Sequence, residues 1–459
     1  MCMKGLFRNI IYYLHAWTAI MLAIGCSSED YTNVIPANIS GLMAIDSRQL
    51  LDRGTGGASE LKLARLLETD RLADCGIAFD ERLYAFETVD GTLGLLAKVQ
   101  NMDDVKDWLG HLKDKGLYSD LAEKKGVIYG VFKEHFIVGL TDNALLVIGP
   151  VLGSEQNETR RKMARMFNRE GDNSSPFVDI VNEMDSPVCI AAKADALPEK
   201  FVAPFILAVP KGTKMSDVNI KATIQPQKNV MLVKGDVYAK KESVNAALQT
   251  AQNTYTQIPK HMLDRLPADN VLTLACGVKG KEVLSALRSN ETFRTMLLGL
   301  NTAIDFDSML KSVEGGLVLT VQEIGDDRWK YLMVADTKDN HWLRDIDYWM
   351  KSCPKGSTII KDKTATNAYQ LIGNGQSLYF GTQGNLLYMA SNKALAGAAS
   401  ETPSATLPVI IRQLLTDSRL AVIVNVDKLV EKDKGMKTAW EVLCSLLGDF
   451  SYLVYKMDK

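Results

Sequence analysis

The stretch Phe136-Ile-Val-Gly-Leu-Thr-Asp-Asn-Ala-Leu-Leu146 consists of two short apolar runs separated by a polar turn. A second version of it, Leu378-Tyr-Phe-Gly-Thr-Gln-Gly-Asn-Leu-Leu-Tyr388, carries Gly381 and Asn385 at the places of the first glycine and asparagine. Apolar runs broken by Thr, Asp, Asn or Gly are typical of antiparallel hairpins, because these residues suit turns. The pair therefore predicts an antiparallel meander in each half of the chain.

Further landmarks repeat in the same order, offset by roughly 230 to 240 residues. Apolar segments can match by chance, but a conserved order of six landmarks favours an internal duplication over chance. The matching segments are Ile35–Asn38 with Leu266–Asp269, Gly41–Ile45 with Val271–Ala275, Gly76–Asp80 with Ala303–Asp307, Val105–Leu112 with Trp342–Met350, Phe177–Met184 with Leu407–Leu415, and Val188–Asp195 with Ala421–Asp427.

Each half is predicted to run strand, helices, hairpin, helix, meander, helix, strand. Val89-Asp90-Gly91-Thr92 is a hairpin turn signal, since Asp-Gly tolerates the positive φ of a tight turn. Trp342, Ile346 and Trp349 stand at helical spacing. Antiparallel meanders with helices on one face predict an α+β fold in two duplicated halves.

The two halves are predicted to span residues 35–258 and 259–459. The first half carries extra strands, Val218–Ile224 and Val230–Ala239, before the second half begins. At the end of the chain Ser451–Met457 matches only the first of them. The partner of this last strand is therefore either missing or supplied by the other half.

Residues 1–25 have the organisation of a secretory signal. Lys4 and Arg8 give a cationic start, and no charged residue follows from Ile10 to Ile24. This apolar run is shorter than the roughly 20 residues of a membrane span, but it suits the core of a signal peptide. We therefore expect it to be removed from the mature protein.

The leader ends in a sequence that resembles a bacterial lipobox. Leu22, Ala23 and Gly25 are the expected recognition residues of the lipoprotein signal peptidase, and the thiol of Cys26 is the expected acceptor of diacylglycerol. The alternative is an uncleaved anchor in which Cys26 is an ordinary buried cysteine. The lipobox predicts an outer-membrane lipoprotein that faces the periplasm or the cell surface.

Residues 26–34 form a polar tether that contains Glu29 and Asp30. A serine and acid cluster after the lipidated cysteine resembles a surface-export signal of some Bacteroidetes lipoproteins, and a plain flexible linker is the alternative. Removal of Lys4 and Arg8 changes the formal charge from −2 to −4. This near balance argues against nucleic acid as a partner, because nucleic-acid binding requires a basic face.

The opening of the mature chain resembles a Bacteroidetes lipoprotein family, domain-of-unknown-function family 4836. The resemblance rests on Tyr31-Thr-Asn-Val-Ile-Pro-Ala37, Asp46, Gly76-Ile77 and Tyr84-Ala-Phe86, and it covers nearly the whole mature chain. Asn38-Ile-Ser-Gly41 departs from the expected alanine or valine. The family implies no activity, ligand or catalytic residue.

No residue set forms an enzyme signature, so we predict no catalytic residue, cofactor or metal. His341 and Asp345 stand at helical spacing, but a structural histidine at a helix start is the simpler interpretation. Gly373-Asn-Gly-Gln-Ser377 is only an echo of a nucleophile elbow in a hairpin context. The five cysteines after Cys26 are widely spread without a CxxC pair, which does not favour a disulfide framework.

Acidic and aromatic residues offer two further candidates. Asp103-Asp104, Asp305/Asp307 and Asp326-Asp327 could supply paired carboxylates, although helix starts and turns explain them better. The aromatics of the second half could stack on sugars, although core packing is the simpler role; they are Trp329, Tyr331, Trp342, Tyr348 and Trp349.

Two classes of function follow from these observations. The favoured hypothesis is a non-enzymatic envelope lipoprotein, bound to the membrane through Cys26, that binds an envelope protein or a glycan. The alternative is an envelope hydrolase acting on glycan or peptide, which would require two carboxylates, or a nucleophile and a base, to converge in a cleft.

Overall fold

The computed structural model describes the chain from residue 31 to residue 458 with gaps. It describes residues 31–53, 58–119, 122–168, 175–196, 213–289, 294, 301, 304–324, 329–363, 365–373, 375–401, 403, 405–431, 444 and 448–458. The chain forms two compact units. Unit 1 holds residues up to 39 together with 73–178, and unit 2 holds 40–72 together with 179–459.

Unit 1 is built on an antiparallel sheet in the order β2–β3–β7–β6–β5–β4. The predicted Asp-Gly turn joins β2 to β3, and Gly91 has the positive φ of 79° that this turn requires. The strands are β2 (Arg82–Thr88), β3 (Leu93–Lys98), β4 (Ala122–Lys124), β5 (Val127–Phe132), β6 (Phe136–Leu140) and β7 (Ala144–Ile148).

Helices pack on this sheet through apolar residues at helical spacing. In α5 (Gln156–Phe167), Met163 and Phe167 approach β6 where Gly139 lacks a side chain; a Cβ there would lie 2.9 and 2.7 Å from them. In α4 (Met102–Asp114) the side chain of Asn101 caps the first turn. The other helices up to residue 182 are η1 (Tyr31–Val34), α2 (Ser47–Arg53), α3 (Ala58–Leu66), η2 (Leu72–Cys75), η3 (Gly153–Glu155) and α6 (Pro176–Asn182).

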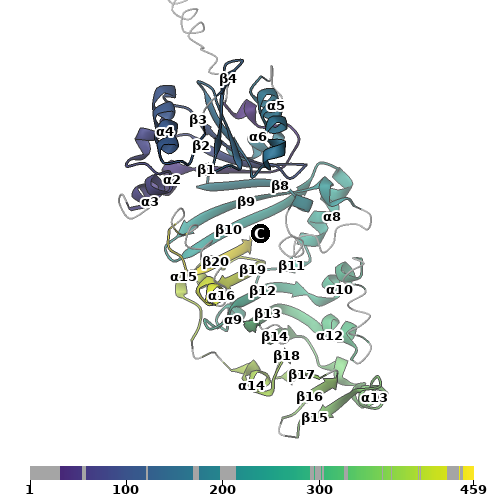
Figure 1. The fold of residues 1–459 in the computed structure, drawn as a ribbon. Coiled ribbons are helices and arrows are strands. Elements are labelled where there is room, and N and C mark those ends of the chain that lie inside the picture. Colours follow the sequence, from purple (N-terminus) through teal and green to yellow (C-terminus); the bar gives the residue numbers. More distant parts are fainter. Residues whose placement is uncertain are drawn as a thin grey trace, which may run out of the picture. The chain divides into compact units, whose positions relative to one another are not determined.

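Unit 2 contains a longer sheet in the order β1–β8–β9–β10–β20–β19–β12–β13–β14–β18–β17–β16–β15. Figure 1 shows these strands side by side. They are β1 (Ile39–Asp46), β8 (Val188–Lys193), β9 (Val218–Gln227), β10 (Val230–Ala239), β12 (Leu272–Lys279), β13 (Val313–Ile324), β14 (Trp329–Thr337), β15 (Ser357–Lys361), β16 (Ala368–Gly373), β17 (Gln376–Gln383), β18 (Leu386–Ala390), β19 (Leu420–Asn425) and β20 (Tyr452–Met457), with β11 (Tyr255–Thr256) paired to β12.

The last strand receives its second partner from the first half of the chain. β20 pairs antiparallel with β19 and parallel with β10, with Leu232 opposite Val454. This is the second of the two outcomes left open by the sequence. The β10–β20 pair is parallel, whereas the other described strand pairs of unit 2 are antiparallel. The sheet is therefore mixed but mostly antiparallel.

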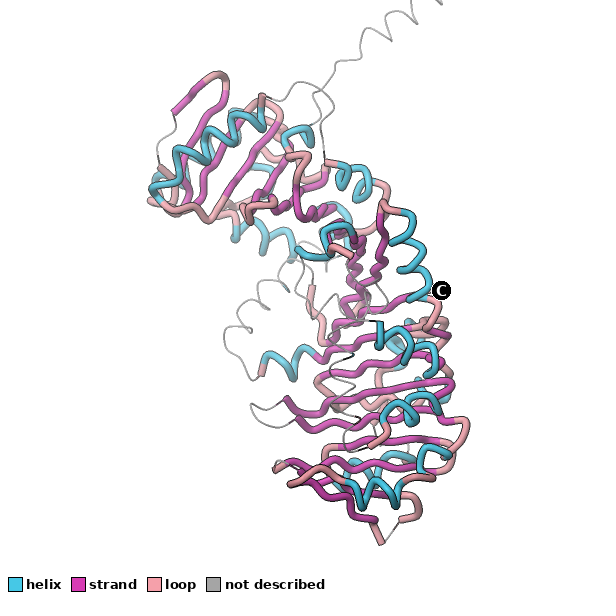
Figure 2. The backbone as a smooth tube through the Cα atoms, turned by 90° about the vertical axis from the view of Figure 1, so that its right-hand side faces the viewer, coloured by secondary structure: helices cyan, strands magenta, loops and turns pink. Residues whose placement is uncertain are grey.

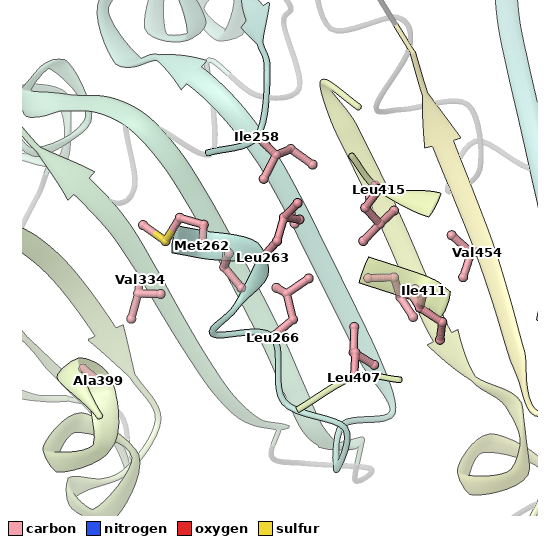
Figure 3. Close-up of a cluster of buried hydrophobic side chains, with 14 of the residues drawn as sticks. Ile258, Met262, Leu263, Leu266, Val334, Ala399, Leu407, Ile411, Leu415 and Val454 are labelled. Atoms are coloured by element: carbon pink, nitrogen blue, oxygen red, sulfur yellow. The ribbon is translucent and has the colours of Figure 1, made fainter. Parts of the chain in front are cut away.

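Two apolar cores lie on opposite faces of the unit 2 sheet, because successive strand residues point to opposite faces. Val334 belongs to one core and its neighbour Ala335 to the other. The first core is filled by α9 (Lys260–Leu263) and α15 (Val409–Leu414). In Figure 3 Leu263 and Leu266 lie beside Leu407, Ile411 and Leu415. The second is filled by η6 (His341–Leu343), α12 (Phe306–Ser312) and α13 (Ile346–Ser352).

The predicted α+β class is thus confirmed, and helices lie on both faces of the unit 2 sheet where a single face was expected. The reason is that strands such as β18 are buried along their whole length. Figure 2 shows helices on both sides of these strands. The helices are η4 (Ala194–Ala196), η5 (Met215–Asp217), α8 (Glu242–Gln252), α9 (Lys260–Leu263), α10 (Gly280–Ser289), α12 (Phe306–Ser312), η6 (His341–Leu343), α13 (Ile346–Ser352), α14 (Lys393–Gly397), η7 (Ala398–Ser400), α15 (Val409–Leu414) and α16 (Val426–Val430).

The order β2–β3–β7–β6–β5–β4 in unit 1 recurs as β13–β14–β18–β17–β16–β15 in unit 2. Equivalent backbone hydrogen bonds accompany it. The carbonyl of Asn143 accepts from the Val99 amide at 3.0 Å, and that of Asn385 accepts from the Thr337 amide at 2.8 Å. The aligned asparagines therefore occupy matching places.

One predicted landmark has a different register in the structure. Val99 and Thr337 are equivalent, since each donates to one of the aligned asparagines. Val99 is bridged to Ile77, whereas Thr337 is paired with Val313. This places Ile77 at the position of Val313, so the alignment of Gly76–Asp80 with Ala303–Asp307 is wrong. The cause is α12, which precedes β13 and displaces the apolar pattern along the sequence.

Candidate functional site

The residues predicted for lipidation and signal-peptidase recognition lie outside the described residues. Leu22, Ala23, Gly25 and Cys26 all precede residue 31. Their roles stay predictions. In the described part of the chain, no helix is both long and apolar enough to cross a membrane.

The histidine at the start of the Trp-bearing helix is not paired with the predicted aspartate. The Nδ1 of His341 lies 3.7 Å from Asp339, and the Asp339 carboxylate accepts from the His341 amide at 3.0 Å. Asp339 thus accepts from the amide two residues further along the chain, as Asn101 of unit 1 accepts from the Asp103 amide at 3.0 Å. The structural interpretation of His341 fits this geometry.

The predicted carboxylate pairs separate into local roles. The backbone amides of Asp103 and Asp104 donate to the side chain of Asn101, which caps α4. The carboxylate of Asp305 caps α12 by accepting from the Ser308 amide at 2.9 Å. Asp307 is ion-paired with Arg288. Asp326 and Asp327 lie outside the described residues.

The aromatic residues of the second half divide between core and surface. Trp342 and Trp349 are buried and stacked, with ring centroids 6.3 Å apart. Tyr331 is half-buried, whereas Trp329 and Tyr348 are 53% and 70% exposed. The core role therefore holds for the two buried tryptophans and not for the two exposed rings.

A polar cleft of about 390 Å³ lies on unit 2, over the middle of β9 and β10 and the end of β20. Figure 1 shows β20, in yellow, beside β10. Its volume lies within the range of small-molecule sites, roughly 300–1,000 Å³. The cleft is lined by Met184, Lys221, Ala222, Thr223, Lys234, Gly235, Asp236, Gln252, Arg419, Lys456, Met457 and Asp458.

Two carboxylates organise the cationic side chains of the cleft. Asp458 lies 2.8 Å from the ammonium of Lys456 and 3.7 Å from that of Lys234. Asp236 lies 3.7 Å from Lys221 and accepts from the Gln252 amide at 2.9 Å. Both acids are thus already engaged with donors of the chain.

Tyr455 lies beneath this charged layer, on the opposite face of β20. Its hydroxyl donates to the carbonyl of Gly235 at 3.4 Å. Burial raises the pKa of Tyr455 well above its usual value, and the nearby charges of Asp236 and Asp458 raise that pKa further. The phenol is therefore neutral at physiological pH and serves as a packing and hydrogen-bonding group.

Part of this cleft can be read from the sequence. Residues 218–224 and 230–239 alternate as strand residues do. The same alternation places Lys221, Thr223, Lys234 and Asp236 on one face. The presence of Lys456 in the cleft could not be predicted from the sequence, because it depends on the pairing of β20 with β10.

A second pair missed by the sequence analysis joins His261 of α9 to Asp336 of β14. The imidazole Nε2 lies 2.9 Å from Asp336, which also accepts from the Gly316 amide at 2.7 Å. The two residues are 75 positions apart, so spacing could not reveal them. No third metal-ligating side chain joins this or any other group in the described part of the chain.

Unit 1 has its own cleft of about 400 Å³, next to the β2–β3 turn. Asp90 accepts from the hydroxyl of Thr88 and from the Lys162 ammonium, the latter at 2.9 Å. The Thr88 hydrogen bond and then Lys162 hold the pKa of Asp90 well below its usual value. The carboxylate ties the turn to α5 rather than acting as an acid.

We expect Asp90→Asn to lower the free energy of unfolding at pH 7 by less than about 1 kcal/mol, since the pair is solvent-exposed. Because the folded pKa is lowered, the ionic contribution is present above the unfolded pKa of about 3.9 and is lost as pH falls through the folded value. Urea unfolding at pH 7 and at a series of pH values falling below 4 measures this, and the deficit should shrink steadily along the series. Asp142→Asn, in the β6–β7 turn, is the control; an Asp90→Asn deficit that persists undiminished at low pH would contradict the ion-pair account.

Comparisons with known proteins address the family. A family model described as a domain of unknown function (DUF4836) matches residues 58–407. Among curated proteins none matches the chain. Of the solved structures, crystal form IV of TP0453 is 14% identical, with 44% of this chain and 78% of that chain covered and a TM-score of 0.29. Crystal form III of TP0453 is 9% identical, with 80% and 94% covered and a TM-score of 0.22. Since the matched residues make up most of its length, the chain belongs to the DUF4836 family, whose function is unknown.

Proposed function

We propose that this protein is an exported, lipid-anchored envelope protein with a non-enzymatic binding function, whose partner is another envelope protein or a glycan. The observation that carries the binding function is the cleft at β9, β10 and β20, in which both carboxylates are engaged by ammonium or amide donors. Such a preorganised polar surface suits recognition of a ligand.

The alternative, an envelope hydrolase, fits this cleft less well. Glycoside hydrolysis uses one carboxyl group as the proton donor and a second as a base or nucleophile. Asp236 and Asp458 are each placed within 4 Å of a lysine ammonium. Each acid thus faces a cation of its own chain, where catalysis would require it to face the scissile bond.

We further infer that the binding scaffold arose by duplication. The inference is supported by the shared strand order of the two halves and by the matching hydrogen bonds to Asn143 and Asn385. The aligned residues Ile35 and Leu266 also support the duplication, because both are fully buried and each precedes a proline. The proposed halves remain 35–258 and 259–459.

The attachment to the membrane is proposed from the lipobox alone. Lipid on Cys26 and the tether that follows it would hold the folded part near an outer-membrane surface. The folded part begins at η1, where Tyr31, Thr32 and Val34 are buried, so only the part of the predicted tether before Tyr31 would act as a linker. Whether that surface faces the periplasm or the exterior depends on how the tether at Glu29 and Asp30 is recognised.

The test is affinity purification of a C-terminally tagged chain from cross-linked intact cells, followed by mass spectrometry and by a polysaccharide array. We expect a reproducible envelope protein, or a bound glycan class, that is absent from a tagged control lipoprotein. Turnover of a glycan or peptide substrate by the purified chain would instead support the hydrolase and overturn this proposal.

A further inference from the structure

Three lysines of the unit 2 cleft converge because of strand register. Lys234 on β10 lies opposite Thr223 on β9 and opposite Lys456 on β20, and Asp236 lies opposite Lys221. Residues that are directly opposite on neighbouring strands point to the same face of a sheet. The ammonium groups therefore gather over one patch of the sheet surface.

The cleft holds more positive than negative charge. Among the described residues that line it, the basic side chains are Lys221, Lys234, Arg419 and Lys456, and the acidic ones are Asp236 and Asp458. Each acid is within ion-pair distance of lysine. Arg419 has no ion pair within 4 Å among the described residues, and the formal excess is two positive charges.

Two of these cations are partly removed from water. The side chain of Lys456 is 10% exposed and that of Arg419 is half-buried. Lys221 and Lys234, at 46% and 44%, are ordinary solvated lysines by comparison. Like charges held together away from water repel each other, and a bound anion would relieve that repulsion.

The donors suit a compact oxyanion. The planar guanidinium of Arg419 can bind two oxygens of a phosphate side by side, while lysine ammonium groups contact it as point charges. Thr223 and Gln252 line the same space, as do Met184 and Met457. A volume of about 390 Å³ accommodates a phosphate together with a body of about one sugar ring.

We propose that this cleft binds a phosphomonoester dianion carried on a compact ligand, through Arg419, Lys234 and Lys456. The inference rests on the proposed binding function and names the chemistry of its ligand. The same headgroup chemistry can come from a soluble sugar phosphate or from an anionic phospholipid.

The test is calorimetric titration of the mature chain with inorganic phosphate, glucose 6-phosphate and unphosphorylated glucose. We expect saturable binding of the first two, no binding of glucose, and weaker binding as ionic strength rises. Arg419→Gln should weaken binding at least about tenfold. Lys330→Gln is the matched control, because Lys330 is a sheet lysine outside the cleft.

Thermal unfolding shows whether Arg419→Gln still folds; if it does not, Lys234→Gln, a 44% exposed strand position, replaces it. Sedimentation with phosphatidylcholine vesicles, with or without phosphatidic acid, identifies the source. Arg419-dependent binding to the phosphatidic acid vesicles alone assigns the ligand to a lipid headgroup.

Two outcomes overturn the anion site. The first is that the wild-type chain binds none of inorganic phosphate, glucose 6-phosphate and phosphatidic acid vesicles. The second is that the wild type and the folded Arg419→Gln or Lys234→Gln variant bind equally. If the tagged chain still recovers its partner from cells under either outcome, the proposed binding function stands and only this inference falls. Substrate turnover would overturn the proposed function itself.

Discussion

Phe380→Ala is expected to lower the free energy of unfolding of unit 2 by about 3–5 kcal/mol. Among the described residues, Phe380 is the largest completely buried side chain. Its ring lies 5.7 Å from that of Tyr369 and 6.4 Å from that of Trp342. Removal of the ring loses apolar burial and leaves a cavity whose walls are fixed by strands on both sides, so the site cannot collapse.

The measurement is urea unfolding followed by tryptophan fluorescence, because Trp342 reports directly on this core. Tyr348→Ala is the matched control: it removes an aromatic ring that is 70% exposed and should change the free energy of unfolding by no more than about 0.5 kcal/mol. Equal effects of the two substitutions would show that Phe380 is not a core residue.

Cys26→Ala is expected to abolish membrane attachment of the mature protein. Without the thiol, diacylglycerol has no acceptor, and the lipoprotein signal peptidase has no substrate. The chain should then accumulate as an unprocessed precursor or leave the membrane fraction. Fractionation of cells, with the size of the chain and its labelling by a fatty acid, measures the result.

Cys2→Ala is the matched control, since Cys2 is a cysteine of the same leader outside the lipobox. It should be processed, labelled and membrane-bound like the wild type. A Cys26→Ala variant that still fractionates as a mature membrane protein would show that the lipobox is not used and would favour an uncleaved anchor.

Local patterns were sufficient to predict most elements of the fold. Gly91, Gly375 and Gly384 all have positive φ in turns, and such positions are readable because few residues tolerate that backbone conformation. The meander around Gly139 and its counterpart around Gly381 are predicted from the polar turn residues between their apolar runs. A register error arose where α12 inserts before β13, because an apolar helix and an apolar strand look alike over a few residues.

Candidate site residues were predictable only where their roles are local. Asp103, Asp104 and Asp305 take part in helix caps, as their positions at helix starts indicated. The His261–Asp336 pair joins residues far apart in sequence and could not be inferred from spacing. The exposure of Tyr348 beside the buried Trp349 likewise depends on which side of α13 meets the sheet.

The α+β class, the turns, the repeated meander and the expectation of a lipid anchor at Cys26 can all be read from the amino-acid sequence, because each depends on residues close together along the chain. Two features depend on contacts between distant parts of the chain: helices cover both faces of the unit 2 sheet, and β20 completes that sheet beside β10. The second of these contacts also brings Lys234 and Lys456 into one cleft. The physical reason is that pairing between distant strands is set by the fit of whole faces and backbone hydrogen bonds, and no local pattern encodes which distant strand will be the neighbour.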